Sequence, residues 1–135
     1  MQNAERRMQS ERCATERRTI MKNIIEQKSF DFAVRVINLY KYLTEQKKEY
    51  VLSKQLLKAG TSIGANVAEG ERGQSKADFN AKMNIALKEA NETYYWLRLL
   101  HRTQYITEDE FHNIEKDIDE IISILVSICK KTKNS

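Results

Sequence analysis

Apolar residues recur every three or four positions along most of the chain, which is the spacing of an amphipathic α-helix. Residues 29–43 carry one such row, made of Phe32, Val36, Leu39 and Leu43 and widened by Ala33, Ile37 and Tyr40. The same spacing returns in residues 52–67, 79–100 and 111–128, and the last of these follows it most strictly. The pattern predicts an all-α fold, an antiparallel up-down four-helix bundle joined by short links.

Polar residues indicate where the predicted helices begin and end. Ser29 suits the N-cap of the first helix, and Ser75 heads a weak capping box before the third. Thr107 and Glu110 form a complete capping box before the fourth. The second helix should end near Gly70, in the loop EGERGQ.

The first twenty residues have a different composition from the rest. They mix five arginines with three glutamates and hold almost no large apolar residue, so burial cannot offset the entropy cost of ordering them. We therefore predict two parts: a flexible or frayed basic N-terminal arm (residues 1–21) and a four-helix bundle domain (residues 22–133). Such an arm either binds nucleic acid or is a dispensable extension, and its composition favours the extension.

The overall composition suits a modest single domain in a reducing compartment. The formal net charge of +4 fits transient contact with an anionic partner, although many ordinary proteins match it. Cys13 and Cys129 lack metal-ligand spacing and nothing resembles a secretory leader, so we expect reduced thiols and a cytoplasmic protein. The longest uncharged run, residues 59–68, is about half of the roughly 20 residues that a membrane span needs, so no membrane association is expected.

The stretch AGTSIGANVAEGERG, residues 59–73, has the composition of a phosphate-binding loop but not its spacing. Three residues separate Gly60 from Gly64 where a P-loop has four, and no Lys-Ser/Thr follows. Gly60, Gly64 and Ala68 instead lie four residues apart, which places small side chains along one side of a helix. This spacing favours a helix-packing seam over a ligand site.

No residue pattern indicates an enzyme. A di-metal bundle needs Glu-x-x-His on two helices, whereas His112 follows Asp109 and His101 follows Arg98. No serine or cysteine has an identifiable general base. We therefore expect no catalytic residue, no metal and no cofactor.

The third predicted helix carries more apolar surface than one core row uses. Large side chains emerge around most of its circumference near its end, at Tyr94, Tyr95, Trp96 and Leu99. Such residues suit a homo-oligomer interface, and the alternative is a helix fully wrapped by the other three.

Basic residues occur in pairs spaced by four, so that each pair could contact adjacent phosphates. The candidate nucleic-acid contacts are Lys54, Lys58, Arg72, Lys76, Arg98 and Arg102. Any single pair is also explained as an ordinary solvated face. Oligomerisation would change this balance, because an assembly repeats each weak patch.

Three segments together resemble a known family: SFDFAVRVINLYKYL (29–43), LSKQLLKAGTSIGANVAEG (52–70) and FNAKMNIALKEANETYYWLRLL (79–100). They are similar to the four-helix-bundle proteins encoded in intervening sequences of bacterial 23S ribosomal RNA genes. The resemblance covers about residues 22 to 130 and leaves out the N-terminal arm. It implies an antiparallel four-helix bundle, no established enzymatic activity and, in several relatives, a pentameric ring with a basic surface.

The resemblance also implies a relationship to the accessory variability proteins of diversity-generating retroelements, which bind nucleic acid and a reverse transcriptase. Residues and resemblance together favour a non-enzymatic, oligomeric protein that binds RNA or DNA through its charged surface. The alternative is an adaptor that docks a reverse transcriptase and contacts nucleic acid through that partner.

Overall fold

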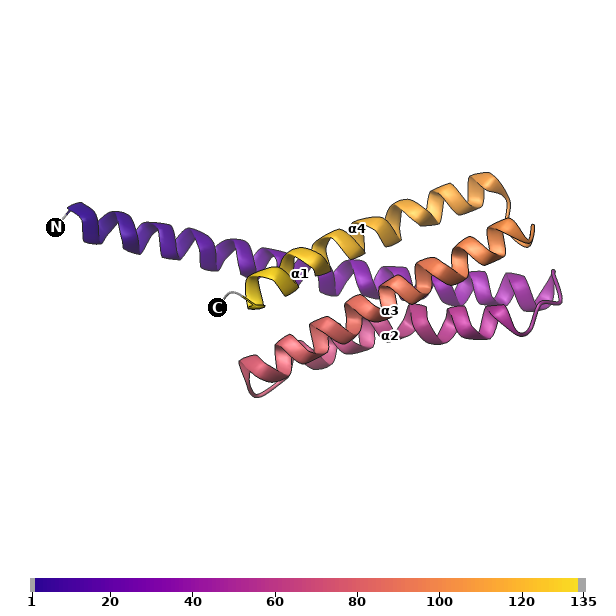
Figure 1. Cartoon of the computed structure of the whole chain (residues 1–135), viewed down its shortest axis with the longest axis horizontal. Helices are drawn as coiled ribbons and strands as arrows, with labels where there is room; N and C mark the ends of the chain where they lie inside the picture. The colour runs from indigo at the N-terminus through magenta and orange to yellow at the C-terminus, as the bar shows by residue number, and fades with distance from the viewer. Residues whose placement is uncertain (1, 134–135) are drawn as a thin grey trace.

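The computed structural model describes residues 2–133, and over this range the chain forms four α-helices and no strand (Figure 1). The helices are α1 (Gln2–Glu45), α2 (Leu52–Glu71), α3 (Lys76–Arg102) and α4 (Glu108–Lys133). The predicted all-α fold and the number of helices are confirmed. The second helix ends one residue past Gly70, as expected.

The predicted start of the first helix is wrong. Ser29 does not cap a helix; it lies buried within α1, and its hydroxyl donates to the carbonyl oxygen of Glu26 at 3.2 Å. The buried row continues upstream through Ile25, and Met21 packs against the core. The polar Ser29 interrupts the apolar row, so the sequence pattern suggested that the helix begins there. A serine whose hydroxyl bonds to its own helix can nevertheless be buried in such a row.

The N-terminal arm is helical where it is described and continues α1 beyond the bundle (Figure 1). Of the side chains described in residues 2–20, only Ala14 is partly buried. At 1.5 Å per residue this segment extends by roughly 28 Å. The flexibility of the arm stays a prediction.

The four helices surround one apolar core. Over the described residues, α1 packs on α2, α2 on α3, α3 on α4 and α4 on α1, and the diagonal pairs make no comparable contact. The apolar row predicted in residues 111–128 is buried throughout, at Phe111, Ile114, Ile118, Ile121, Leu125 and Ile128. Of the predicted positions on α1, Phe32, Val36 and Leu43 are buried and Ala33, Leu39 and Tyr40 are half-buried. Ile37 is 39% exposed and lies outside the core, because it stands about 200° around the helix from Leu39.

Small residues allow α1 and α2 to approach closely. A Cβ atom added at Gly60 would lie 2.7 Å and 2.8 Å from the two methyl carbons of Val36. One added at Gly64 would lie 3.2 Å from the backbone oxygen of Ser29. The side of α2 that carries these glycines therefore faces α1, at a distance that leaves no room for a methyl group at Gly60.

Two of the predicted caps are present. The Ser75 hydroxyl accepts the backbone N–H of Asp78 at 3.1 Å. The Thr107 hydroxyl accepts the N–H of Glu110 at 3.1 Å and donates to the Glu110 carboxylate at 2.9 Å. Side-chain oxygens thus satisfy an N–H group in the first turn of both α3 and α4.

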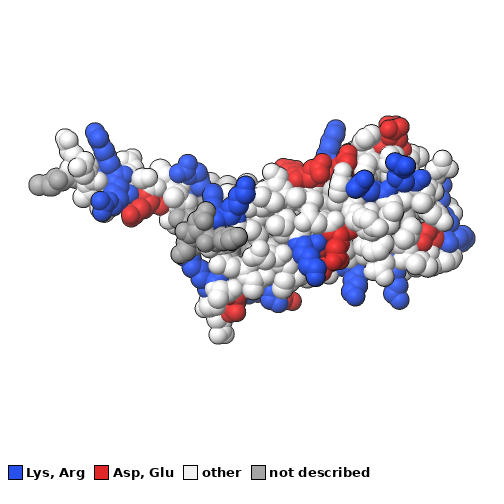
Figure 2. Space-filling view, viewed as in Figure 1, with Lys and Arg blue, Asp and Glu red and all other residues white. Residues whose placement is uncertain are grey.

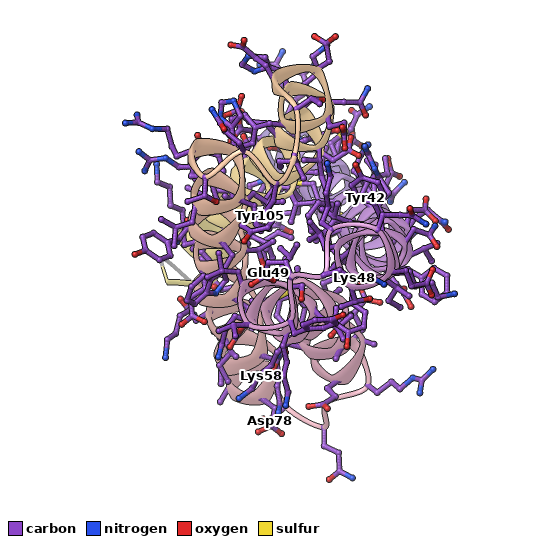
Figure 3. The ribbon with its side chains drawn as sticks, turned by 90° about the vertical axis from the view of Figure 1, so that its right-hand side faces the viewer. Tyr42, Lys48, Glu49, Lys58, Asp78 and Tyr105 are labelled. Atoms are coloured by element: carbon purple, nitrogen blue, oxygen red, sulfur yellow. The ribbon has the colours of Figure 1, made fainter. Side chains whose placement is uncertain are left out.

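The N-terminus of α2 is capped by Glu49, which the sequence did not single out (Figure 3). One carboxylate oxygen accepts the N–H groups of Val51 and Leu52 at 3.1 Å and 2.8 Å, and the other accepts that of Ser53 at 2.7 Å. Burial alone would raise the pKa of Glu49, but these backbone bonds and one from the Ser53 hydroxyl outweigh it and hold the pKa below its ordinary value.

Candidate nucleic-acid interface

The six predicted nucleic-acid contacts are all exposed, and they fall into two groups. Lys54 and Lys58 lie early in α2, and Arg98 and Arg102 lie late in α3. The start of α2 and the end of α3 are at the same end of the bundle (Figure 1). Arg72 and Lys76 flank the α2–α3 loop at the opposite end, so the structure does not bring all six together.

Several other cations are neutralised between helices. Lys28 of α1 pairs with Glu120 of α4 at 2.9 Å, Arg35 of α1 pairs with Asp117 of α4, and Lys82 of α3 pairs with Glu69 of α2 at 2.7 Å. Within residues 2–133 none of the six candidates forms an ion pair; Arg98 lies over the Tyr94 ring at 5.9 Å from its centroid. Their charges are therefore available to an anionic partner.

The surface carries no single basic face on the side seen in Figure 2. Basic side chains follow the projecting arm and surround the right-hand end of the bundle, with acidic side chains interspersed on the body. The electrostatic potential of one chain is therefore spread out, as the sequence indicated.

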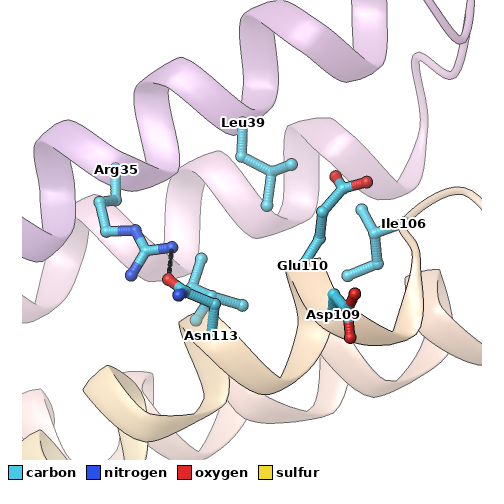
Figure 4. Close-up of a pocket in the computed structure, with 7 residues that line it drawn as sticks. Arg35, Leu39, Ile106, Asp109, Glu110 and Asn113 are labelled. Atoms are coloured by element: carbon cyan, nitrogen blue, oxygen red, sulfur yellow. Dashed lines mark hydrogen bonds between the residues drawn. The ribbon is translucent and has the colours of Figure 1, made fainter.

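A hollow between α1 and α4 is unsuited to anions (Figure 4). It has a volume of about 390 Å³, and Asp109 and Glu110 contribute negative charge to its lining. Among the described residues, this lining has one cation, Arg35, which donates to Asn113 at 2.6 Å and pairs with Asp117. Its charge is used within the protein, so this hollow does not fit a phosphate.

The four apolar residues predicted for a subunit interface on α3 do not share one side of the helix. Tyr94 turns toward α4, where its hydroxyl donates to the Glu115 carboxylate at 2.8 Å. This bond, followed by burial and the charge of Glu115, raises the pKa of Tyr94; it also lowers the pKa of Glu115. Leu99 is half-buried.

Tyr95 lies on the outside of α3, next to Trp96, which is half-buried and packs against the core. Tyr95 is 53% exposed and meets Trp96 edge to face, with 5.2 Å between ring centroids. Both line a hollow of about 510 Å³, which Lys88 and Glu92 also border. Aromatic residues bordered by charges are typical anchors of protein interfaces.

A second exposed apolar surface, which sequence reasoning missed, lies on α1. We call it the outer face of α1; it comprises Ile20, Ile24, Phe30, Val34 and Ile37, all at least 38% exposed. Phe30 and Val34 each stand two residues, or about 200°, from the buried Phe32 and Val36. The signal was present as a second row of apolar residues, but Ile37 was assigned to the core row.

The described residues contain neither a metal-type cluster nor a membrane-spanning helix. No group of three or more His, Cys, Asp or Glu side chains within them could hold a metal ion. None of their helices combines the length and the apolar character needed to cross a bilayer.

Comparison with known proteins places the bundle in a family. The family model described as 23S rRNA-intervening sequence protein matches residues 21–127, which is most of the chain. The chain belongs to this family. The predicted resemblance is thus confirmed, and the matched range excludes nearly all of the arm.

A solved structure supports the assignment to the 23S rRNA-intervening sequence protein family. It is a crystal structure of a protein with unknown function from the S23 ribosomal protein family, from Bacteroides thetaiotaomicron VPI-5482. The two chains are 56% identical with a TM-score of 0.80, over 82% of this chain and 98% of that one. No curated protein matches the chain.

Proposed function

We propose that this member of the 23S rRNA-intervening sequence protein family is a non-enzymatic, oligomeric RNA-binding protein of the cytoplasm. One observation carries the proposal: the six candidate cations are exposed and form no ion pair within residues 2–133, whereas Lys28, Arg35 and Lys82 are neutralised. Unpaired lysines and arginines bind the phosphate backbone without reading bases, and they release counterions when they do.

We further propose that the subunits form a closed ring, five-membered as in several relatives. A ring needs two different complementary patches on each subunit. Two candidates are the outer face of α1, and on α3 the exposed Tyr95 beside the half-buried Trp96. Because α1 and α3 are diagonal in the bundle, these patches face away from each other, which suits head-to-tail closure.

The proposed bundle is antiparallel. Lys28 pairs with Glu120, Arg35 pairs with Asp117, and the Lys131 ammonium donates to the sulfur of Met21, so residue numbers rise along α1 as they fall along α4. Short connections at alternating ends support the same arrangement for the other neighbours.

Salt dependence and charge reversal test the RNA-binding proposal. Affinity for structured RNA should fall steeply as salt rises, and Lys54→Glu with Lys58→Glu should reduce the slope of log K against log[salt] by about 1.5–2. The matched control is Lys116→Glu with Lys130→Glu, two exposed lysines of α4 outside the candidate set and outside both proposed interface patches. Affinity that ignores salt, or that falls equally in both double variants, would refute the assignment.

Mixing two interface variants tests the ring. Phe30→Glu damages only the outer face of α1, and Tyr95→Glu damages only the patch on α3. Each alone should dissociate the assembly in analytical ultracentrifugation, and an equimolar mixture should recover one intact contact and form a heterodimer. A mixture that stays monomeric contradicts two complementary patches, and variants that both keep the wild-type mass contradict either patch as an interface.

The second candidate function is an adaptor for a polymerase such as a reverse transcriptase. The hollow beside Tyr95 and Trp96 favours it, because it offers aromatic anchors that a protein partner could fill. Co-purification of a reverse transcriptase that survives nuclease and is lost with Trp96→Ala would support this candidate. Recovery that depends on intact RNA would favour the first function.

A further inference from the structure

A hollow of about 460 Å³ lies at the end of the bundle from which the arm projects. All four helices contribute to its lining: Lys22 from α1, Glu71 from α2, Phe79 and Asn80 from α3, and Lys131 from α4. Its volume is within the range of sites that hold one small organic molecule.

Two buried oxygen atoms in this hollow have no hydrogen-bond donor within the described residues. They are one carboxylate oxygen of Glu71 and the amide oxygen of Asn80. A buried acceptor without a donor destabilises a fold, so such atoms are uncommon in native proteins. Burial, followed by a hydrogen bond with Glu26 and the charge of Glu26, raises the pKa of Glu71 to about 7, while the charge of Lys22 acts in the opposite direction. The two orphaned oxygens, one on each residue, could each accept an N–H or O–H donor.

Three lysines at the same hollow favour a different kind of ligand group, one that carries negative charge. Lys22 lies over the Phe79 ring, 4.6 Å from its centroid, and Lys131 donates to the weak acceptor sulfur of Met21 at 3.3 Å. Lys76 is exposed, and within residues 2–133 none of the three forms an ion pair. Together they favour an anion at the rim.

We propose that this hollow is a binding site for a single nucleotide whose base carries an exocyclic amine. A nucleotide of adenine, cytosine or guanine combines an amine, which can donate to Asn80 and Glu71, with a phosphate, which can contact Lys76 and its neighbours. Uracil has no amine and leaves an acceptor unsatisfied. The nucleotide can be a free 5′-monophosphate or an unpaired residue of an RNA strand; the second source rests on the proposed RNA-binding function.

The test compares the four ribonucleoside 5′-monophosphates on the full-length protein at pH 7, by calorimetry and by the side-chain amide resonance of Asn80. The amine-bearing bases should bind at least about tenfold more tightly than UMP, because an unpaired buried polar group weakens binding by at least that factor. Lys76→Ala should weaken all four by a similar factor.

The second experiment uses RNA hairpins that differ only in one bulged nucleotide, either cytidine or uridine, with a fully paired hairpin as reference. Preference for bulged cytidine without affinity for CMP identifies the strand as the source, and CMP binding identifies the free nucleotide. If no hairpin binds at all, the proposed RNA-binding function is wrong. The monophosphate measurements then still show whether the hollow binds a nucleotide.

Asn80→Leu provides a second readout. It should reduce the discrimination between cytosine and uracil in whichever experiment shows it, because only the Glu71 acceptor remains, and it should raise the melting temperature, because it removes an unsatisfied buried acceptor. Asn80→Ala serves if the larger side chain disturbs folding. Equal affinity for amine-bearing and amine-free bases in both experiments, or discrimination that neither substitution reduces, overturns the inference.

Discussion

The close approach of α1 and α2 at Gly60 predicts that a single methyl group there destabilises the bundle. In Gly60→Ala the new Cβ would lie 2.7 Å from one Val36 methyl carbon and 2.8 Å from the other. Val36 is fully buried and β-branched, so its side chain has one strongly preferred rotamer in a helix and cannot turn away. The helix backbones must therefore separate or the valine must adopt a strained rotamer.

Two opposing energies set the size of the effect. Alanine is about 1 kcal/mol better than glycine inside a helix, which favours the variant. Overpacking a filled core costs typically 1–3 kcal/mol, and contacts below 3 Å with both methyls place this site in the upper part of that range. Gly60→Ala should thus lose about 1–2 kcal/mol of unfolding free energy. Ala65→Gly, at an exposed position of α2, measures the helix-propensity contribution separately.

A double-mutant cycle with Val36→Ala tests the steric cause. Val36→Ala alone should cost about 2 kcal/mol by leaving a cavity, whereas in the Gly60→Ala background the new methyl partly fills that cavity. Urea unfolding of the four proteins should therefore give a coupling energy of about 1–3 kcal/mol. Additivity within about 0.5 kcal/mol would refute the proposed contact, as would a Gly60→Ala variant that is more stable than the wild type.

Three further predictions concern charged residues and the arm. Glu49→Gln should lose about 1–3 kcal/mol at pH 7, because the Ser53 N–H loses its acceptor. Since the folded state lowers the pKa of Glu49, the difference should begin to shrink as pH falls below 4.5 and vanish only below the lowered pKa; Glu45→Gln should show no difference. Glu71→Gln should be more stable than the wild type at pH 8 and equal to it below pH 4.5, because a carboxyl with a pKa of about 7 costs stability as pH rises from 4.5 to 7. Deletion of residues 2–20 should change the melting temperature by only a few degrees, because these side chains are almost all exposed; a large drop would show that the arm supports the bundle.

Local signals made much of the fold predictable. The buried row of α4 follows a strict three-and-four spacing without interruption, and the Ser75 and Thr107 caps depend only on residues within one turn. The small-residue spacing at Gly60 and Gly64 likewise indicated which side of α2 meets another helix, although not which helix.

The errors arose where spatial context outweighs local pattern. Ser29 has the side chain of a cap but lies in a buried row, and Ile37 has the side chain of a core residue but lies on the outer face of α1. Glu49 lies before α2 and accepts backbone N–H groups of its first turn through a long side chain, which differs from the Ser or Thr N-cap of a standard capping box. The nucleotide site could not be found at all, since residues from all four helices meet only in the folded chain.

The unsatisfied oxygens at one end of the bundle are informative because the other buried side-chain polar atoms of the described residues all have hydrogen-bond partners. Glu49 uses both carboxylate oxygens, the buried Ser29 and Thr93 hydroxyls donate to carbonyl oxygens of their own helices, and the buried Ser53 hydroxyl donates to the carbonyl oxygen of Glu49 just before α2. Within the described part of the chain, the orphaned side-chain atoms are confined to Glu71 and Asn80, which line one hollow. Random imperfection would scatter such atoms, and selection for stability alone would replace them with apolar residues at little cost. Their concentration beside three lysines is therefore better explained by a ligand that supplies hydrogen-bond donors and negative charge together.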